Sequence, residues 1–170
     1  SKVALIYGPA GTGKTTIIDF ISQLFENYDK LFLAQTNPAV QNLQRRVSKS
    51  KSEFSTITKY LGNRQYSPYD IIVIDECSTV SNADMRNILK IGNFSYLVLV
   101  GDTYQIESID FGNWFSLAPK FIPKRYCFEL VVPYRTKNKC LLDVWNKVRN
   151  LDSDILEYLT AFGYSTKLDE

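Results

Sequence analysis

One short motif near the start of the chain restricts its fold and chemistry more than any other segment. The motif follows an apolar run at 3–7 and precedes a helix-like segment at 14–25. Its spacing is G-x-x-x-x-G-K-[ST], in which backbone N–H groups and the helix N-terminus face one bound phosphate. We therefore predict that a nucleotide binds to this motif. The motif consists of Gly8, Pro9, Ala10, Gly11, Thr12, Gly13, Lys14, Thr15 and Thr16.

Two side chains of this motif have chemistry of their own. The ammonium group of Lys14 can reach the β- and γ-phosphates, and the hydroxyl of Thr15 can bind Mg²⁺. A glycine turn that matches by chance is the alternative, but the strand before it and the helix after it argue against that. The motif alone does not decide whether the γ-phosphoryl group passes to water or to another acceptor.

The composition is that of one ordinary globular domain. The chain has 170 residues, 45% of them hydrophobic, and a net charge of +2, which neither requires nor excludes a nucleic-acid partner. It has no histidine, and its three cysteines are far apart, which excludes Cys/His zinc sites and His-based triads. No apolar run approaches the ~20 residues of a membrane span. We expect a reduced, cytoplasmic protein without membrane contact.

Four continuous apolar runs predict buried strands, at 3–7, 31–34, 71–74 and 96–100. Helical patterns follow at 38–47 and 83–91, Ser81 fits a helix cap, and a last helix is expected near 154–162. This alternation predicts an α/β fold with a central, mainly parallel sheet covered on both faces. The polar, basic stretch at 47–55 is typical of a surface loop.

An acidic pair, Asp75 and Glu76, directly follows the third apolar run. The carboxyl ends of parallel strands face the ligand crevice, so this pair should meet the phosphate loop, and we expect the two to end adjacent strands. Asp75 would then hold Mg²⁺ together with Thr15, and Glu76 would polarise a water molecule for in-line attack. Such a pair favours hydrolysis over transfer. The alternative is a strand end with solvated charges.

The fourth apolar run ends in the same way, with Gly101, Asp102 and, three residues later, Gln105. A glutamine at this place can sense the γ-phosphate or orient the attacking water. On its own this would be a plain strand-to-turn junction. Three strands that end in polar residues make a nucleotide-hydrolysing site the better interpretation.

Six segments together resemble motifs of the superfamily 1 helicases, in the RecD-like and Upf-like branch. GPAGTGKTT is similar to the first helicase motif, LAQTNPAV to motif Ia, and FSTITKYL to the threonine-containing segment after it. IIVIDECSTV is similar to motif II, LVGDTYQIESIDFG to motif III, and ELVVPYRT to the arginine-finger segment. The resemblance extends over residues 1–136.

The resemblance implies a P-loop NTPase (RecA-like) three-layer fold and an ATP-dependent helicase or translocase motor domain. It implies ATP and Mg²⁺ as cofactors, and movement along single-stranded nucleic acid, DNA rather than RNA, toward the 3′ end. The catalytic residues would be Lys14, Glu76, Gln105 and Arg135, with Arg135 on the γ-phosphate. Residues 1–136 would form the first motor domain, and 137–170 a helical extension leading to a second motor domain. We therefore expect a fragment of a longer protein, weakly active in isolation.

Hydroxyl and amide side chains at strand ends and helix starts are candidates for nucleic-acid contacts. Thr36, Asn37, Thr56 and Thr58 could bind the phosphates of a single strand, as the resemblance implies. The alternative is that they are only caps and turns, where Thr and Asn are favoured in any case. Trp114 could stack on a base but is more typical of a core residue.

Two other functions compete with a nucleic-acid motor. A P-loop phosphotransferase would need an arginine-bearing lid, for which IPKRYCF at 122–128 is a short candidate. A regulatory nucleotide switch would turn over slowly, and single-stranded nucleic acid would not change its rate. The acidic pair and Gln105 favour hydrolysis over the phosphotransferase.

Overall fold

A computed structural model gives the structure of residues 2–63, 67–102, 113–132, 134, 140, 143–144, 147 and 153–161. The chain forms two compact units, Ser1–Val132 and Pro133–Glu170. The second unit contains helix α7 (Ile155–Ala161). In the first unit the elements are, in order, β1 (Lys2–Tyr7), α1 (Lys14–Leu24), β2 (Lys30–Ala34), α2 (Asn37–Arg46), β3 (Ser52–Thr56), α3 (Ile57–Leu61), β4 (Tyr69–Ile74), η1 (Cys77–Thr79), α4 (Asn82–Ile91), β5 (Phe94–Gly101), α5 (Trp114–Phe121), η2 (Lys124–Tyr126) and β6 (Cys127–Glu129).

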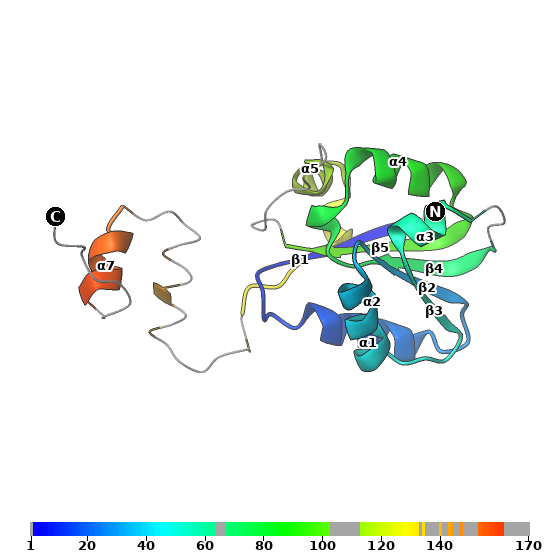
Figure 1. Cartoon of the computed structure of the whole chain (residues 1–170), viewed down its shortest axis with the longest axis horizontal. Coiled ribbons are helices and arrows are strands. Elements are labelled where there is room, and N and C mark those ends of the chain that lie inside the picture. The colour runs from blue at the N-terminus through cyan, green and yellow to red at the C-terminus, as the bar shows by residue number, and fades with distance from the viewer. Residues whose placement is uncertain are drawn as a thin grey trace. The chain divides into compact units, whose positions relative to one another are not determined.

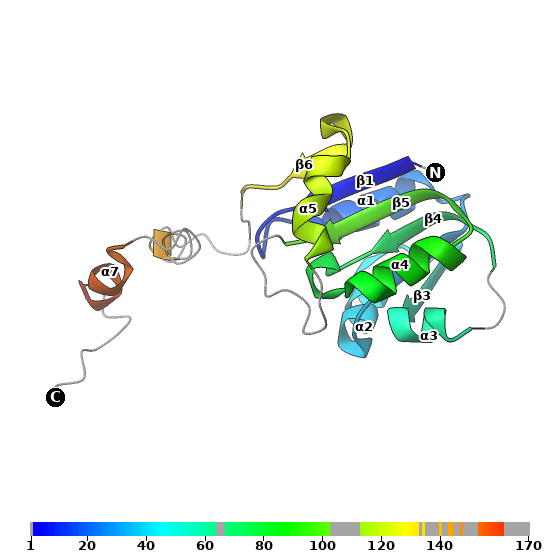
Figure 2. The ribbon, with the colours of Figure 1, turned by 90° about the horizontal axis from the view of Figure 1, so that it is seen from above.

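The first unit is built on a six-stranded sheet in the order β3-β2-β4-β5-β1-β6. Every pair of neighbouring strands runs parallel. Helices α3, α4 and α5 cover one face, and α1 and α2 cover the other (Figures 1 and 2). The predicted three-layer α/β fold with a parallel sheet is thus confirmed.

The central strands are apolar throughout because both of their faces are buried. All five residues of β2 are buried, and alternate side chains enter different cores. Leu31 and Leu33 pack with residues of α3 and α4, whereas Phe32 and Ala34 pack with residues of α1 and α2. The four strands predicted from apolar runs are β1, β2, β4 and β5.

The prediction missed two strands, β3 and β6, and two helices, α3 and α5. Residues 52–55 were expected to lie in a surface loop, but Ser52–Thr56 forms the edge strand β3, paired with β2. Strand β6 has only three residues and pairs with the end of β1. Helix α5 contains Pro119, which breaks the usual helical pattern.

Helices α2, α3 and α4 begin at residues whose side chains accept a hydrogen bond from the first turn. The hydroxyl of Ser81 accepts from the backbone N–H of Asp84 at 3.0 Å, so the predicted cap of α4 is confirmed. Thr36 and Thr56 cap α2 and α3 in the same manner. In the part of the chain that the structure describes, no helix combines the length and apolarity needed to cross a membrane.

Lys30 is a charged residue that is only 1% exposed. Its ammonium group donates to the backbone carbonyls of Phe25, at 2.7 Å, and Tyr28, at 2.8 Å. These carbonyls follow the C-terminus of α1, where a cation also interacts favourably with the helix dipole. Lys30 therefore stabilises the turn that carries the chain from α1 into β2.

We expect Lys30→Met to lower the free energy of unfolding by about 1–3 kcal/mol, because two partly buried backbone carbonyls lose a charged donor. Urea unfolding followed by circular dichroism measures the change. Lys49→Met at an exposed position is the matched control and should change stability by less than about 0.5 kcal/mol. Equal effects of the two substitutions would contradict a stabilising role for the Lys30 contacts.

Candidate nucleotide site

The phosphate loop leads directly into the first turn of α1. Gly13 is the cap residue of this helix and has φ 90°, a left-handed conformation that glycine adopts without strain. No side chain caps this helix end, and its first turn has no acidic residue. Backbone N–H groups and the positive end of the helix dipole are therefore available to an anion.

The start of the loop is held between two neighbouring segments. The N–H of Gly8 donates to the carbonyl of Gly101 at 3.2 Å, and the N–H of Leu130 donates to the carbonyl of Tyr7 at 2.8 Å. A Cβ atom on Gly8 would collide with the carbonyl oxygen of Leu130. Only glycine fits this close approach, so the first glycine of the motif is needed for packing as well as for the turn.

Two side chains of the loop bind the loop backbone itself. The Lys14 ammonium donates to the carbonyls of Gly8, at 2.6 Å, and Pro9, at 2.9 Å. The Thr12 hydroxyl, in a residue only 4% exposed, donates to the carbonyl of Pro9 at 2.8 Å. Thr12 therefore braces the loop, while Lys14 lies across its mouth, where a phosphate would arrive.

Asp75 lies mostly buried at the end of β4. Burial, and to a smaller extent the negative charge of Glu76, together raise the pKa of its carboxyl group to about 6 against two opposing effects. The backbone N–H of Glu76, which donates to Oδ1 at 2.9 Å, and the Lys14 ammonium lower this pKa. The influence of Lys14 on this pKa is consistent with the strand order, which places the phosphate loop and Asp75 at the same edge of the sheet.

Glu76 follows with an exposed side chain and a left-handed backbone, with φ 55° and ψ 40°. Its carbonyl accepts the hydroxyl of Thr79 at 2.8 Å and the N–H of Thr79 at 2.9 Å. The backbone therefore turns sharply after Asp75. Asp75 stays mostly buried at the strand end, while the Glu76 carboxylate lies in solvent.

One geometric expectation needs correction. The phosphate loop and the acidic pair were expected to end adjacent strands, but β5 lies between β1 and β4. Both loops still lie at the carboxyl edge, because all strands run parallel. The end of β5 places Asp102, which is 5% exposed, between them.

The residues at this edge fit a nucleotide with Mg²⁺. An uncapped helix N-terminus and a lysine suit phosphate oxygens, and a mostly buried carboxylate with a raised pKa is stabilised by a cation. Thr15 in the first turn of α1 and Asp75 at the end of β4 would hold the metal. Gln105 and Arg135 lie outside the described residues.

The four candidate nucleic-acid residues lie at the carboxyl ends of β2 and β3. Thr36 and Thr56 use their hydroxyls to cap helices, as the simpler interpretation expected. Asn37 and Thr58, in the first turns of α2 and α3, are exposed. Thr36 and Thr56 could cap a helix and still contact a ligand, and the side chains of Asn37 and Thr58 are accessible to solvent.

Sequence reasoning missed a contribution of Trp114 to this region. Its indole N–H donates to the carbonyl of Val80 at 2.7 Å, just after the turn that begins at Glu76. The ring packs against the core under α4 and α5, so the core interpretation of Trp114 is the correct one. An asparagine followed by tryptophan before an amphipathic run was the available signal for a helix start.

Removing the charge of Asp75 should stabilise the metal-free protein in a pH-dependent way. The raised pKa means that the neutral acid is favoured in the folded state, so this stability is full below about pH 4 and lost as pH rises through about 6. Asp75→Asn should therefore gain roughly 1–3 kcal/mol at about pH 8 and almost nothing at about pH 4.

Urea unfolding with a chelator present, at several pH values, measures this gain. Glu26→Gln at an exposed carboxylate is the control and should leave the pH dependence unchanged. An Asp75→Asn variant that is less stable than the wild type at the upper pH would show that ionised Asp75 is well compensated without a cation.

Comparison with known proteins agrees with this geometry. The model of a family described as AAA domain matches residues 1–163. Uncharacterized protein MJ1519 of Methanocaldococcus jannaschii is 25% identical over 187 residues, which cover 91% of this chain and 16% of that protein. The ATP-dependent RecD2 DNA helicase of Deinococcus radiodurans is 27% identical over 123 residues, covering 65% of this chain and 17% of that protein.

A solved structure of Bacteroides Pif1 bound to single-stranded DNA is similar in fold, with a TM-score of 0.68 and 18% identity. The similarity covers 95% of this chain and 46% of that one. The chain thus spans about one sixth of the curated relatives and under half of the solved structure. The chain belongs to the AAA domain family, as a P-loop nucleoside triphosphatase domain related to the RecD-like helicases.

Proposed function

We propose that the chain is the first motor domain of an ATP-dependent helicase that hydrolyses ATP while moving along single-stranded DNA. The observation that carries this proposal is that the phosphate loop after β1 and the Asp75–Glu76 turn after β4 lie at the same carboxyl edge of a parallel sheet. The Lys14 ammonium there lowers the pKa of Asp75. The similarity to a RecD2 helicase and to a Pif1 structure with bound single-stranded DNA supports the choice of partner. A second motor domain, movement toward the 3′ end and a cytoplasmic location belong to the same proposal.

The residues of the site have separate tasks in hydrolysis. Bound ATP with Mg²⁺ would supply the electrophilic γ-phosphorus and neutralise charge on its oxygens. The N–H groups of α1 would bind phosphate oxygens, and Lys14, which bonds the carbonyls of Gly8 and Pro9, would bind the β- and γ-phosphates. Asp75 and Thr15 would hold the metal. The exposed Glu76 carboxylate accepts a proton from the attacking water.

Hydrolysis is favoured over transfer to another substrate for a structural reason. The segment at 122–128, which was the candidate lid of a phosphotransferase, forms η2 and the start of β6. Its Cys127 and Phe128 pair with Leu5 and Ile6 of β1. A segment fixed in the sheet is not free to close over an acceptor, so water is the better nucleophile.

The proposed path of nucleic acid follows from strand order. Strands β2 and β3 lie on the far side of β4 from the phosphate loop. Their carboxyl ends carry Asn37 and Thr58 on exposed first turns of α2 and α3. A single strand bound across these turns would lie beside the Asp75–Glu76 turn without entering the nucleotide site.

Replacing Glu76 with glutamine tests the hydrolytic proposal. Glu76→Gln keeps the side-chain shape and the metal ligand Asp75 but removes the proton acceptor. Single-turnover hydrolysis of ATP with single-stranded DNA should slow by a factor on the order of 10²–10⁴, while ATP affinity stays nearly the same. Rapid-quench measurement of phosphate release gives the rate, and equilibrium titration gives the affinity.

Lys14→Ala is the companion variant, which should lose ATP affinity and still unfold cooperatively, because the ammonium binds loop carbonyls and phosphate rather than packing in the core. Phosphoryl transfer to an acceptor other than water would support a phosphotransferase. A wild-type rate that single-stranded DNA does not change would support a nucleotide switch. Unchanged hydrolysis by Glu76→Gln would remove this residue from the mechanism.

The nucleic-acid surface has its own test. Asn37→Ala and Thr58→Ala combined should weaken binding of a fluorescent oligodeoxythymidine by roughly 5–30-fold, since two polar contacts to the strand are lost. Ser95→Ala, at an exposed position near the amino end of β5, is the control and should bind normally. Fluorescence anisotropy measures the affinity of each protein. Equal affinity of the wild type, the double variant and Ser95→Ala would mean that nucleic acid does not bind at Asn37 and Thr58.

A further inference from the structure

The backbone at Glu76 has a conformation that a residue with a Cβ atom rarely adopts. Its φ of 55° lies in the left-handed region, where the side chain crowds the following carbonyl. This conformation costs free energy and persists only where the surroundings hold it. It also directs the Glu76 carboxylate into solvent while Asp75 remains mostly buried. The contacts that maintain it therefore affect the geometry of the proposed proton acceptor.

Most of these contacts are local to the turn. The N–H of Glu76 donates to Asp75 Oδ1 at 2.9 Å, and its carbonyl accepts the hydroxyl of Thr79 at 2.8 Å. The N–H groups of Thr79 and Val80 donate to the carbonyls of Glu76, at 2.9 Å, and Cys77, at 3.2 Å. Together they close a short helical turn from Glu76 to Val80.

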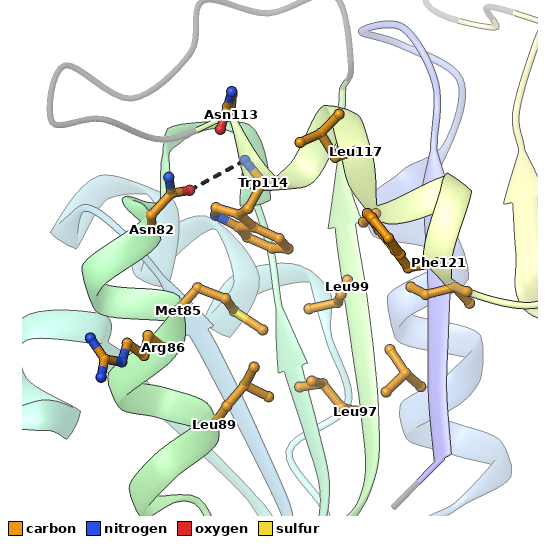
Figure 3. A pocket seen from close by; sticks show the side chains of 13 residues that line it. Asn82, Met85, Arg86, Leu89, Leu97, Leu99, Asn113, Trp114, Leu117 and Phe121 are labelled. Atoms are coloured by element: carbon orange, nitrogen blue, oxygen red, sulfur yellow. Dashed lines mark hydrogen bonds between the residues drawn. The ribbon is translucent and has the colours of Figure 1, made fainter.

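One contact fixes this turn from another part of the chain. The indole N–H of Trp114 donates to the carbonyl of Val80 at 2.7 Å, across 34 residues of sequence. The backbone N–H of Trp114 donates to Asn82 Oδ1 at 3.3 Å, so the tryptophan is tied to the start of α4 as well (Figure 3). Both bonds end on the segment that directly follows the Glu76 turn.

The indole ring is itself held in place from several sides. Its neighbour Phe115 is 2% exposed and meets the ring edge to face, with centroids 5.5 Å apart. The Phe115 ring fills the space beside Gly101 so closely that a Cβ atom there would lie 2.7 Å away. In Figure 3 the indole points into the space between α4 and α5, above Met85. The contacts with Phe115 and Asn82 thus help to direct the indole N–H toward Val80.

We propose that Trp114 is a positioning residue for ATP hydrolysis, which fixes the Val80 end of the turn and thereby keeps Glu76 in its left-handed conformation. The inference rests on the proposed hydrolytic function of Glu76. Trp114 acts through the backbone of the turn, with no contact to nucleotide or water required. Loss of its donor loosens the turn and lets Glu76 relax to an ordinary conformation, with its carboxylate displaced.

Trp114→Phe is the direct test, because phenylalanine keeps an aromatic ring in the apolar space and removes the N–H donor. We expect the single-turnover rate of ATP hydrolysis with single-stranded DNA to fall roughly 10-fold, since small displacements of a catalytic group have effects of this order. ATP affinity should stay within about twofold, because the phosphate loop is unchanged. Leu117→Ala, one turn further along α5 and lining the same pocket, is the matched control and should keep the wild-type rate.

A double-mutant comparison separates positioning from general destabilisation. If Trp114 acts through Glu76, then Trp114→Phe should have no further effect on the rate in a protein that already carries Glu76→Gln. A further 10-fold loss in that background would overturn the inference. It would mean that the tryptophan affects hydrolysis by another route.

Hydrogen exchange gives a readout that does not depend on turnover. The amides of Thr79 and Val80, which are bonded within the turn, should exchange faster in Trp114→Phe and normally in Leu117→Ala. Wild-type exchange in Trp114→Phe overturns the proposed clamp, and faster exchange with unchanged turnover overturns the positioning role. A full-length parent protein that does not hydrolyse ATP would instead overturn the proposed function alone, because hydrogen exchange still reports on the Trp114–Val80 contact.

Discussion

Parallel pairing of all six strands is the constraint on which the nucleotide site depends. It sends every carboxyl end to one edge, so polar residues that follow β1, β4 and β5 must meet there. The β-ladders then set their relative height, since the N–H of Gly8 donates to the carbonyl of Gly101 at the end of β5, and β5 pairs with β4 as far as Leu99 and Ile74. The phosphate loop cannot shift against the acidic turn unless one of these ladders breaks.

Two neighbouring residues at this edge, Asp75 and Glu76, lower the stability of the folded protein. Asp75 is mostly buried with a pKa raised to about 6, so its ionised form is unfavourable until a cation arrives. Glu76 is held in a left-handed conformation that costs about 1–3 kcal/mol. Both features become useful only with bound ligand: the cation relieves the first, and the second directs a carboxylate toward water. Burial of β2 and most of β4 in the core stabilises the fold and offsets the unfavourable free energy of these two residues.

Sequence patterns predicted the features that depend on neighbouring residues. The strands with apolar runs, the phosphate loop and the Ser81 cap were all found, because each is encoded within a few residues. Strand β3, with the sequence SEFST, lies at an edge and is polar, so no buried run marks it. The Trp114–Val80 bond and the conformation of Glu76 depend on contacts between distant segments, which periodicity cannot reveal. The same limit applied to strand order, where β5 separates the two strands expected to be adjacent.

Strand order also determines how the two proposed ligands would influence each other. The phosphate loop ends β1, the proposed nucleic-acid turns follow β2 and β3, and β4 lies between these groups. The shortest route between the ligands therefore crosses the end of β4, where Asp75 and Glu76 are found. The indole N–H of Trp114, in α5, bonds to Val80 at the end of the turn after Glu76. The backbone N–H of Trp114 bonds to Asn82, the first residue of α4. A strand bound beside this turn would shift Glu76 before any other catalytic group, because Lys14 and Thr15 lie two strands further away. Nucleic-acid stimulation of hydrolysis would then act on the position of the proton acceptor, with phosphate binding left as it is.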